Sequence, residues 1–453
     1  MKNDLTSGTP LKQILNFMLP ILIGNIFQQF YNMADMIIVG QILGVKALAA
    51  VGATGSIYFV IFGFAYGIAS GVTVVTAHLV GAKENDQVSG SIAASYIICG
   101  AVAIVFTLIG WGLSGWILRV LNTPGDIVQQ AQAYLEVIFL GIGATIFYNL
   151  IASIVRALGD SRTPLIFLIV ASLLNIALNY FFISALHMDV RGSALATVVS
   201  QFFSGLGCLL YALKKYPQLH LKKYHWKMNR EWIFRHVNMG LPVAFQTSIT
   251  GIGVMIFQSA LNSFGSTTVA AFTACSKVES LAIMPMFSIG LALTTFVAQN
   301  YGAGQIVRIK QSVKLCLIVN LCLSAAGSLV VIFLYAPIIQ IFVGKNQPQV
   351  LEISHTYLKV VGSFYFSAAI LFVYRSALQG MGNTFMPMIG GFIELIMRVA
   401  AALFLAERFG FIGLSMAYPL AWIGAAIPLV AAYLIILKKR YYDSSNNYDS
   451  IKI

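Results

Sequence analysis

The chain has 453 residues, of which 58% are hydrophobic and only 9% are charged, against about 25% charged residues in a typical globular protein. With a mean hydropathy of +0.83, this composition excludes an ordinary soluble enzyme and predicts a polytopic membrane protein. The apolar runs are long and do not alternate residue by residue, which indicates helices rather than strands. The formal net charge of +13 bears first on membrane topology and does not indicate a nucleic-acid partner.

Apolar runs of about 20 residues, the length that crosses the hydrocarbon core of a bilayer, occur twelve times along the chain. They predict an all-α protein with twelve transmembrane helices. In chain order, the expected centres of the spans are Ile23, Phe64, Val102, Leu140, Ser172, Phe203, Gly253, Phe287, Ala325, Ser367, Leu395 and Leu429.

The basic residues are distributed unevenly between the two sides of the predicted membrane. The termini and every second loop hold 19 of the 28 Lys and Arg residues, whereas the opposite loops hold five. By the positive-inside rule, both termini are expected in the cytoplasm of a multi-pass plasma membrane protein. Residues 214–235 form a basic cytoplasmic linker, which either contacts anionic lipid headgroups or is a solvated topogenic segment; residues 441–453 form a polar tail.

The sequence repeats itself at an offset near 222 residues. Leu19-Pro20 returns as Leu241-Pro242, and the turn 159–161 (Gly-Asp-Ser) returns at 382–384 (Gly-Asn-Thr). In each turn Gly can end one helix, and Asp or Asn can cap the next. We therefore expect two six-helix bundles, residues 1–213 and 236–440, related by a pseudo-twofold axis along the membrane normal. Such parallel repeats occur in transporters, and the duplication disfavours a channel or a receptor.

Several segments together resemble the multidrug and toxic compound extrusion (MATE) family. They are the run from Gln28 to Asp35, the loop from Gln299 to Gly304, and the two Gly-containing turns with their following prolines. The resemblance implies a secondary antiporter, not an enzyme, that exports organic cations or drugs across the plasma membrane by alternating access. It implies Na⁺ or H⁺ as the coupling ion, no other cofactor, membrane lipids around a monomer, and no nucleic-acid partner. A lipid-linked oligosaccharide flippase of related architecture is the alternative, although four intramembrane basic residues are few for one.

Ionisable residues within spans are functional candidates because burying a charge in the bilayer is costly. Asp35 lies in the first span with no basic residue within a helical turn, so it is suited to binding H⁺ or Na⁺. Asn175 and Asn179 share a face of span five because they are four residues apart, and Thr197 adds a hydroxyl in span six. Their spacing resembles the cation site of the DinF-like branch, with no other metal site expected. Asn179 replaces a frequent Asp, which makes a two-carboxylate proton relay doubtful.

The second half does not duplicate this set of residues. Thr250 stands where the NorM-like branch has a Glu, so the chain resembles the DinF-like branch more closely. Glu394 precedes Arg398 by four residues, a favourable helical pair. With Glu279, these residues are predicted to form a charged network that lines a cavity of the second half. The network either takes part in substrate binding or coupling, or is a structural ion pair that fixes helix packing.

Overall fold

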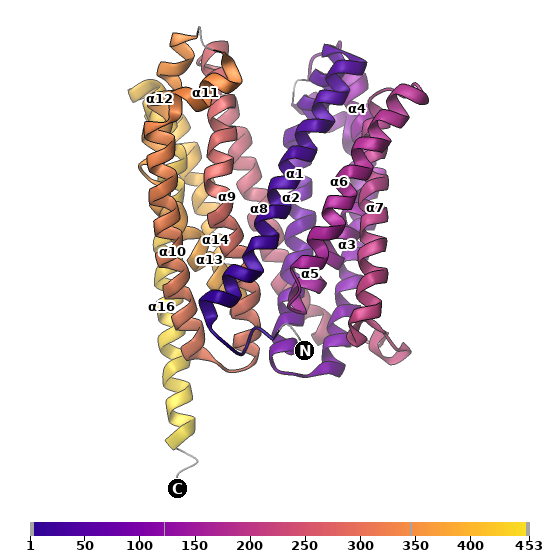
Figure 1. Ribbon diagram of the computed structural model, residues 1–453, viewed down its shortest axis with the longest axis vertical. Coiled ribbons are helices and arrows are strands. Elements are labelled where there is room, and N and C mark those ends of the chain that lie inside the picture. Colours follow the sequence, from indigo (N-terminus) through magenta and orange to yellow (C-terminus); the bar gives the residue numbers. More distant parts are fainter. Residues whose placement is uncertain (1–3, 122, 345–346, 450–453) are drawn as a thin grey trace. The chain divides into compact units, whose positions relative to one another are not determined.

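The computed structural model describes residues 4–121, 123–344 and 347–449. In the first half of the chain, the helices follow one another with short connections (Figure 1). They are α1 (Pro10–Leu43), α2 (Val45–Gly81), α3 (Asn85–Val120), α4 (Val128–Leu140), α5 (Ile142–Ala157), α6 (Arg162–Tyr180), which continues as the π-helical segment Phe181–Ala185, and α7 (Val190–Lys215). Two short 3₁₀ segments, Pro217–Leu219 and Lys223–Trp226, then lead through the basic stretch to α8 (Arg230–Asn262).

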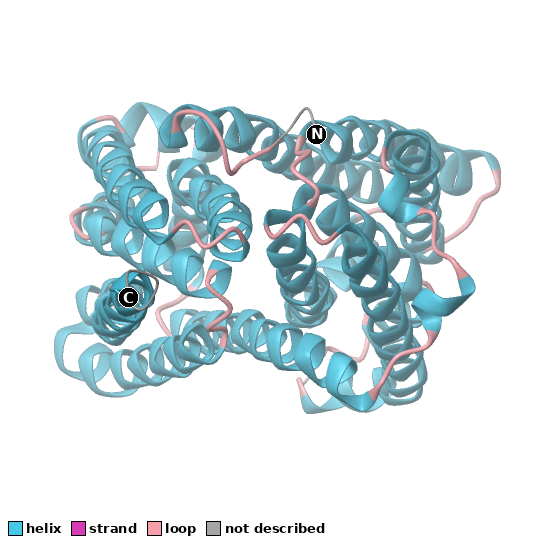
Figure 2. Ribbon diagram, turned by 90° about the horizontal axis from the view of Figure 1, so that it is seen from below, coloured by secondary structure: helices cyan, strands magenta, loops and turns pink. Residues whose placement is uncertain are grey.

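The second half repeats the same pattern. It begins with α8 and continues with α9 (Ser266–Gly302), α10 (Ile306–Phe333), α11 (Tyr335–Val343), α12 (Pro348–Gly362), α13 (Tyr365–Gly380), α14 (Phe385–Ala400), which continues as the π-helical segment Ala401–Leu405, α15 (Ala406–Ser415) and α16 (Ala417–Asp449). Figure 2 shows these elements as helices joined by loops, and no strand occurs among the described residues. The end of α16 lies within the stretch that was expected to be a polar tail.

Ten helices of the described chain are long and apolar enough to cross a membrane. Two further spans consist of bent helix pairs, α4 with α5 at 48° and α12 with α13 at 45°. The predicted all-α fold with twelve transmembrane spans is therefore confirmed. The two bends lie at equivalent places in the two halves, since α4–α5 and α12–α13 each form the fourth span of their repeat.

The chain divides into two compact units. Unit 1 contains residues 20–244, and unit 2 contains residues 4–19 and 245–453. The divisions therefore lie inside α1 and α8, next to Pro20 and close to Pro242, each of which is inside its helix. Proline removes a backbone hydrogen bond and tends to kink a helix, so each of these two helices has a locally weakened point near the division.

The two repeated glycine-containing turns have the same local construction. Gly159 and Gly382 have φ values of +90° and +83°, a conformation that ends a helix and that glycine adopts without strain. Asp160 Oδ1 then accepts from the backbone N–H of Arg162 and Thr163, and Asn383 Oδ1 accepts from the backbone N–H of Met386. The predicted capping of the following helix is confirmed in both repeats.

In unit 1, α2 and the beginning of α8 approach closely at two glycines. A Cβ atom placed on Gly71 would lie 2.7 Å from Gly240 Cα and 2.8 Å from Met239 O. Because these neighbours are backbone atoms, a side chain at position 71 must push the helices apart. Glycine thus permits the close backbone approach that stabilises membrane helix pairs.

We expect Gly71→Val to cost about 1–3 kcal/mol through overpacking. The loss is measured as a lower temperature at which the purified protein leaves its monodisperse size-exclusion peak. Gly100→Val in α3 is the matched control, because nothing lies within 4 Å of a Cβ placed on Gly100. Equal stability losses in the two variants would show that the α2–α8 contact does not depend on glycine.

Candidate functional site

The carboxylate of Asp35 lies on α1 in the interior of unit 1. The residue is only 8% exposed, and its Oδ1 accepts two hydrogen bonds, from Asn179 Nδ2 at 2.7 Å and from Ser193 Oγ at 2.9 Å. Asp35 takes part in none of the four ion pairs found in the described part of the chain. A buried carboxylate is thus held by neutral donors from α6 and α7.

The hydrogen bonds continue from Asp35 through the polar face of α6. Asn179 Nδ2 also donates to Asn175 Oδ1 at 2.8 Å, and Asn175 Nδ2 donates to Thr197 Oγ1 at 3.3 Å. Tyr31, one helical turn before Asp35 on α1, donates its hydroxyl to the same Thr197 Oγ1 at 3.2 Å. The structure therefore brings together all four residues of the predicted cation site and adds Ser193 and Tyr31.

One oxygen atom of this group has no hydrogen-bond partner. Asn179 Oδ1 is buried, and no donor of the described residues reaches it. Asn175 and Asn179 are themselves fully buried, and an unpaired buried acceptor normally costs free energy. This unpaired oxygen and the neighbouring Asp35 carboxylate are oxygen ligands of the kind that hard cations prefer.

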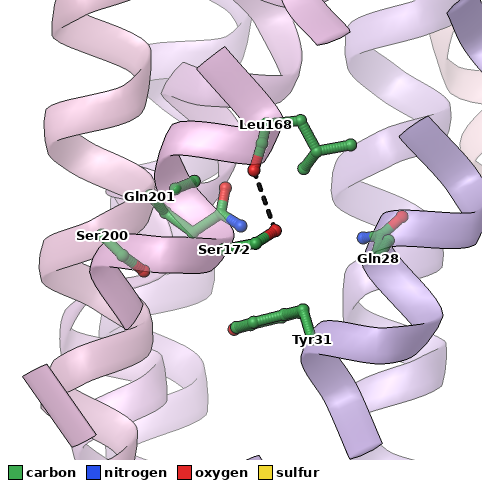
Figure 3. A pocket seen from close by; sticks show the side chains of 7 residues that line it. Gln28, Tyr31, Leu168, Ser172, Ser200 and Gln201 are labelled. Carbon is green, nitrogen blue, oxygen red and sulfur yellow. Dashed lines mark hydrogen bonds between the residues drawn. The ribbon is translucent and has the colours of Figure 1, made fainter. Parts of the chain in front are cut away.

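A pocket in unit 1 lies beside this group, between α1, α6 and α7. Figure 3 shows the side chains that line it: Gln28 and Tyr31 from α1, Leu168 and Ser172 from α6, and Ser200 and Gln201 from α7. Ser172 Oγ donates to the Leu168 carbonyl, and Gln201 is 6% exposed with an Oε1 that no donor of the described chain reaches. Since Tyr31 both lines the pocket and bonds Thr197, the pocket and the Asp35 group share a residue.

In the second half, the partner that joins Glu394 and Arg398 is Arg375 and not the predicted Glu279. In unit 2, Glu394 pairs through Oε1 with Arg375 of α13, and through Oε2 with Arg398 at 3.4 Å. Arg398 Nη1 also donates to the Thr250 carbonyl of α8 at 3.1 Å. Glu394 and Arg398 are each 2% exposed, so this is a buried triad of two arginines and one carboxylate.

Glu279 stands apart from the triad. It lies on α9, is 8% exposed, and its Oε2 accepts from the Tyr357 hydroxyl of α12 at 2.8 Å. None of the ion pairs in the described chain joins it to Arg398 or Arg375. The structure thus brings Glu394 and Arg398 together and leaves Glu279 with a neutral partner.

A model of the MatE family matches this chain twice, at residues 20–181 and 242–404, which together make up more than half of it. The chain belongs to the MATE family. The family's proteins are transporters, so the chain is a multi-pass membrane transporter and not an enzyme. The second match begins at residue 242 and the first at residue 20, which gives the offset of 222 residues that the sequence repeats had indicated.

MATE relatives cover nearly the whole chain. The probable multidrug resistance protein NorM of Thermotoga maritima is 29% identical over 431 residues, which make up 92% of this chain and 89% of that protein. The probable multidrug resistance protein YpnP of Bacillus subtilis is 28% identical over 381 residues, 84% of each chain. A crystal structure of MATE in complex with MaL6 has a TM-score of 0.90 at 22% identity, covering 98% of this chain and 100% of that one. The overall MATE fold is therefore shared.

Four residues of these sites, Ser193, Tyr31, Arg375 and Tyr357, were not predicted as members of them. Ser193 precedes Thr197 by four residues on α7, so their shared helix face was a signal that could have found it. Arg375 was recognisable as an intramembrane charge, but its partner Glu394 lies on another helix. Tyr357 likewise lies on a different helix from its partner Glu279. Each π-helical segment begins within three residues of a polar residue of these sites, Asn179 on α6 and Arg398 on α14, and π-helical segments frequently occur at functional sites.

Proposed function

We propose that this MATE protein is a cation-coupled secondary antiporter that exports organic cations and drugs across the plasma membrane. The observation that carries the proposal is the buried Asp35 carboxylate, which is held by neutral donors and adjoins an oxygen without a partner. The relatives named above as probable multidrug resistance proteins support drugs as the substrate class. The pocket that shares Tyr31 with this group has no free volume for a substrate in this conformation, so substrate binding there would require its lining helices to separate.

The coupling ion is H⁺ or Na⁺, and both fit the chemistry of the group. A proton on Asp35 would turn an acceptor into a group that also donates, so the hydrogen bonds through Asn179 would have to rearrange. A sodium ion would instead use carboxylate, amide and hydroxyl oxygens, and Asn179 Oδ1 already faces no donor of the described chain. In either case Asp35, Asn175, Asn179 and Thr197 are the cation-coupling residues.

Ion binding can drive export only if it favours one conformation of the transporter. An ion shifts the equilibrium between two states by its difference in affinity for them, and the coupling is reciprocal between ion and substrate. The bond from Tyr31 to Thr197 gives a direct physical link, because a change in the Asp35 group alters the position of a residue in the pocket wall. Occupancy of Asp35 would therefore alter the affinity of the pocket for substrate.

Several finer features belong to the same proposal. The charge distribution supports cytoplasmic termini, and the chain is taken to act as a monomer among membrane lipids. The oxygen-rich group of the first half, with Thr250 in place of a Glu in the second, supports the DinF-like branch. Glu394 and Arg398, with Glu279 at a distance, would then serve substrate binding or helix packing in unit 2.

The test is transport in proteoliposomes under an imposed Na⁺ gradient or an imposed pH gradient, each alone, with ethidium as the substrate. We expect one of the two gradients to drive uphill ethidium movement at least about tenfold faster than the other. Uphill movement without any ion gradient would contradict secondary antiport. Protein-free liposomes under the same gradients give the background rate.

A lipid-linked oligosaccharide flippase remains the alternative for this architecture. It predicts translocation of a labelled lipid-linked oligosaccharide between the leaflets of the same liposomes, and no gradient-driven movement of ethidium. In cells, deletion of the gene would then cause a cell-wall defect, whereas the antiporter predicts lost drug tolerance without one. The two functions therefore differ in both assays.

A further inference from the structure

The buried triad of unit 2 carries an unbalanced positive charge. Arg375 and Arg398 share one carboxylate, Glu394, through its two separate oxygens. The second acidic residue of the region, Glu279, acts on Arg398 only at longer range and accepts its hydrogen bond from Tyr357. An uncompensated charge inside a membrane protein is costly and is typical of a functional position.

We propose that the triad is a binding site for an anionic group, a carboxylate or a phosphate, in unit 2. Both arginines have a guanidinium N–H that nothing in the described chain accepts, because the buried Nε atoms of Arg375 and Arg398 lack partners. The guanidinium fork matches the two oxygens of a carboxylate or phosphate. An anion here would neutralise the surplus charge and satisfy these donors at the same time.

The surroundings hold Arg398 in place from several helices. Its Nη1 donates to the Thr250 carbonyl, and its guanidinium lies over the Tyr418 ring of α16 at 5.0 Å from the centroid. A Cβ atom on Gly253 would lie 2.9 Å from Arg398 Nη1, so glycine lets the guanidinium lie against α8 in this position without being displaced. A group fixed in this way loses little conformational freedom when it binds a ligand.

Arg375 is the more accessible of the two arginines. Its side chain is 12% exposed, against 3% for Arg398, and it lies on α13 four residues before Gln379. Gln379 Nε2 donates to Gln246 Oε1 at 2.9 Å, which extends the polar surface along α8 and α13. An anionic group can therefore reach Arg375 first, with Arg398 as the buried end of the site.

The site differs in ligand class from the proposed cation-coupling group, and it can be tested without transport. Purified protein in a neutral detergent is equilibrated by dialysis with naphthoate, naphthyl phosphate or the uncharged naphthamide, which share one ring system. We expect naphthoate or naphthyl phosphate to bind at least about tenfold more tightly than naphthamide. Equal affinities for the three probes would overturn the proposal.

The decisive variant is Arg375→Gln, which removes the surplus charge while Glu394 keeps Arg398 as its partner. It should weaken anion binding by about tenfold or more, since hydrogen bonds to charged groups are strong, and leave naphthamide binding unchanged. Arg408→Gln is the control, because Arg408 is an exposed arginine of α15 in the same unit. If the Arg375→Gln protein elutes as a monodisperse peak and still binds the anions with wild-type affinity, the triad serves only to pack helices.

A lipid headgroup and a soluble anion offer the same chemistry to this site. Repeating the dialysis in nanodiscs of phosphatidylcholine and of phosphatidylglycerol separates the two sources. Competition by phosphatidylglycerol that disappears in Arg375→Gln would assign the site to an anionic headgroup. Undiminished naphthoate binding in both lipids would assign it to a soluble anion.

Discussion

Asp35→Asn is expected to abolish ion-coupled transport, reducing substrate-induced ion efflux from everted vesicles to the level of vesicles without the protein. Asparagine cannot take up a proton, and it lacks the charge that holds a sodium ion. The substitution keeps the shape of the side chain and an oxygen that can accept from Asn179 and Ser193, as Asp35 Oδ1 does. The fold should therefore survive while the bias that the ion exerts on the two conformations is lost.

Asp189→Asn is the matched control for this variant. Asp189 is exposed and caps α7 by accepting from the Arg191 backbone N–H at 2.9 Å, and Asn caps a helix about as well as Asp. Its coupled transport should equal that of the wild type. Normal substrate-induced ion efflux from Asp35→Asn vesicles, at equal protein content, would refute the assignment of Asp35.

The members of the Asp35 group could be recognised individually from the sequence, each within its own span. Asn175 and Asn179 share a helix face by their spacing of four, and a carboxyl in an apolar span stands out in any membrane protein. The resemblance to the MATE family supplied the rest, namely that span one meets spans five and six. Spacing within one helix gives no information about which helices are neighbours.

In the second half, contacts between residues of one helix could be predicted from the sequence, but contacts between different helices could not. Glu394 and Arg398 lie one helical turn apart, so their pair was predictable, but Arg375 reaches Glu394 from α13. Glu279 likewise finds Tyr357, a residue 78 positions away, instead of Arg398. Such contacts depend on the relative rotation of neighbouring helices, which small residues such as Gly253 and Gly391 set and which hydropathy does not report.

Asp160→Ala is expected to cause the largest loss of stability among single substitutions outside the spans. Asp160 is 2% exposed at the turn between α5 and α6. Its Oδ2 accepts from Lys215 Nζ at 2.7 Å, Tyr216 OH at 2.8 Å and Thr163 Oγ1 at 2.7 Å, while Oδ1 caps α6. Removing the carboxylate leaves donors from α6 and the end of α7 without their acceptor, at a cost of about 3 kcal/mol or more. The apparent melting temperature should fall by roughly 6–12 °C.

The repeated turn supplies the control for this experiment. Asn383 occupies the equivalent place in the second half, but its side chain accepts from the Met386 backbone N–H at 3.2 Å, and no lysine of the described residues bonds to it. Asn383→Ala should therefore cost only about 1 kcal/mol, the usual worth of a helix cap. If both variants melt at the same temperature, the contacts with Lys215 and Tyr216 add no stability beyond the cap.

The pH dependence gives an independent measure of the same contacts. Burial alone would raise the pKa of Asp160, but the hydrogen bonds from Lys215, Thr163 and Tyr216 outweigh it and lower the pKa to about 2. The carboxylate is therefore more acidic in the folded protein than in the unfolded chain, where its pKa is about 3.9. Its stabilisation is complete above that value and is lost as the pH falls through about 2. The difference in melting temperature between wild type and Asp160→Ala should thus stay constant from about pH 5 to pH 8 and shrink below about pH 4, because protonation removes from the wild type the charge that the variant lacks at every pH.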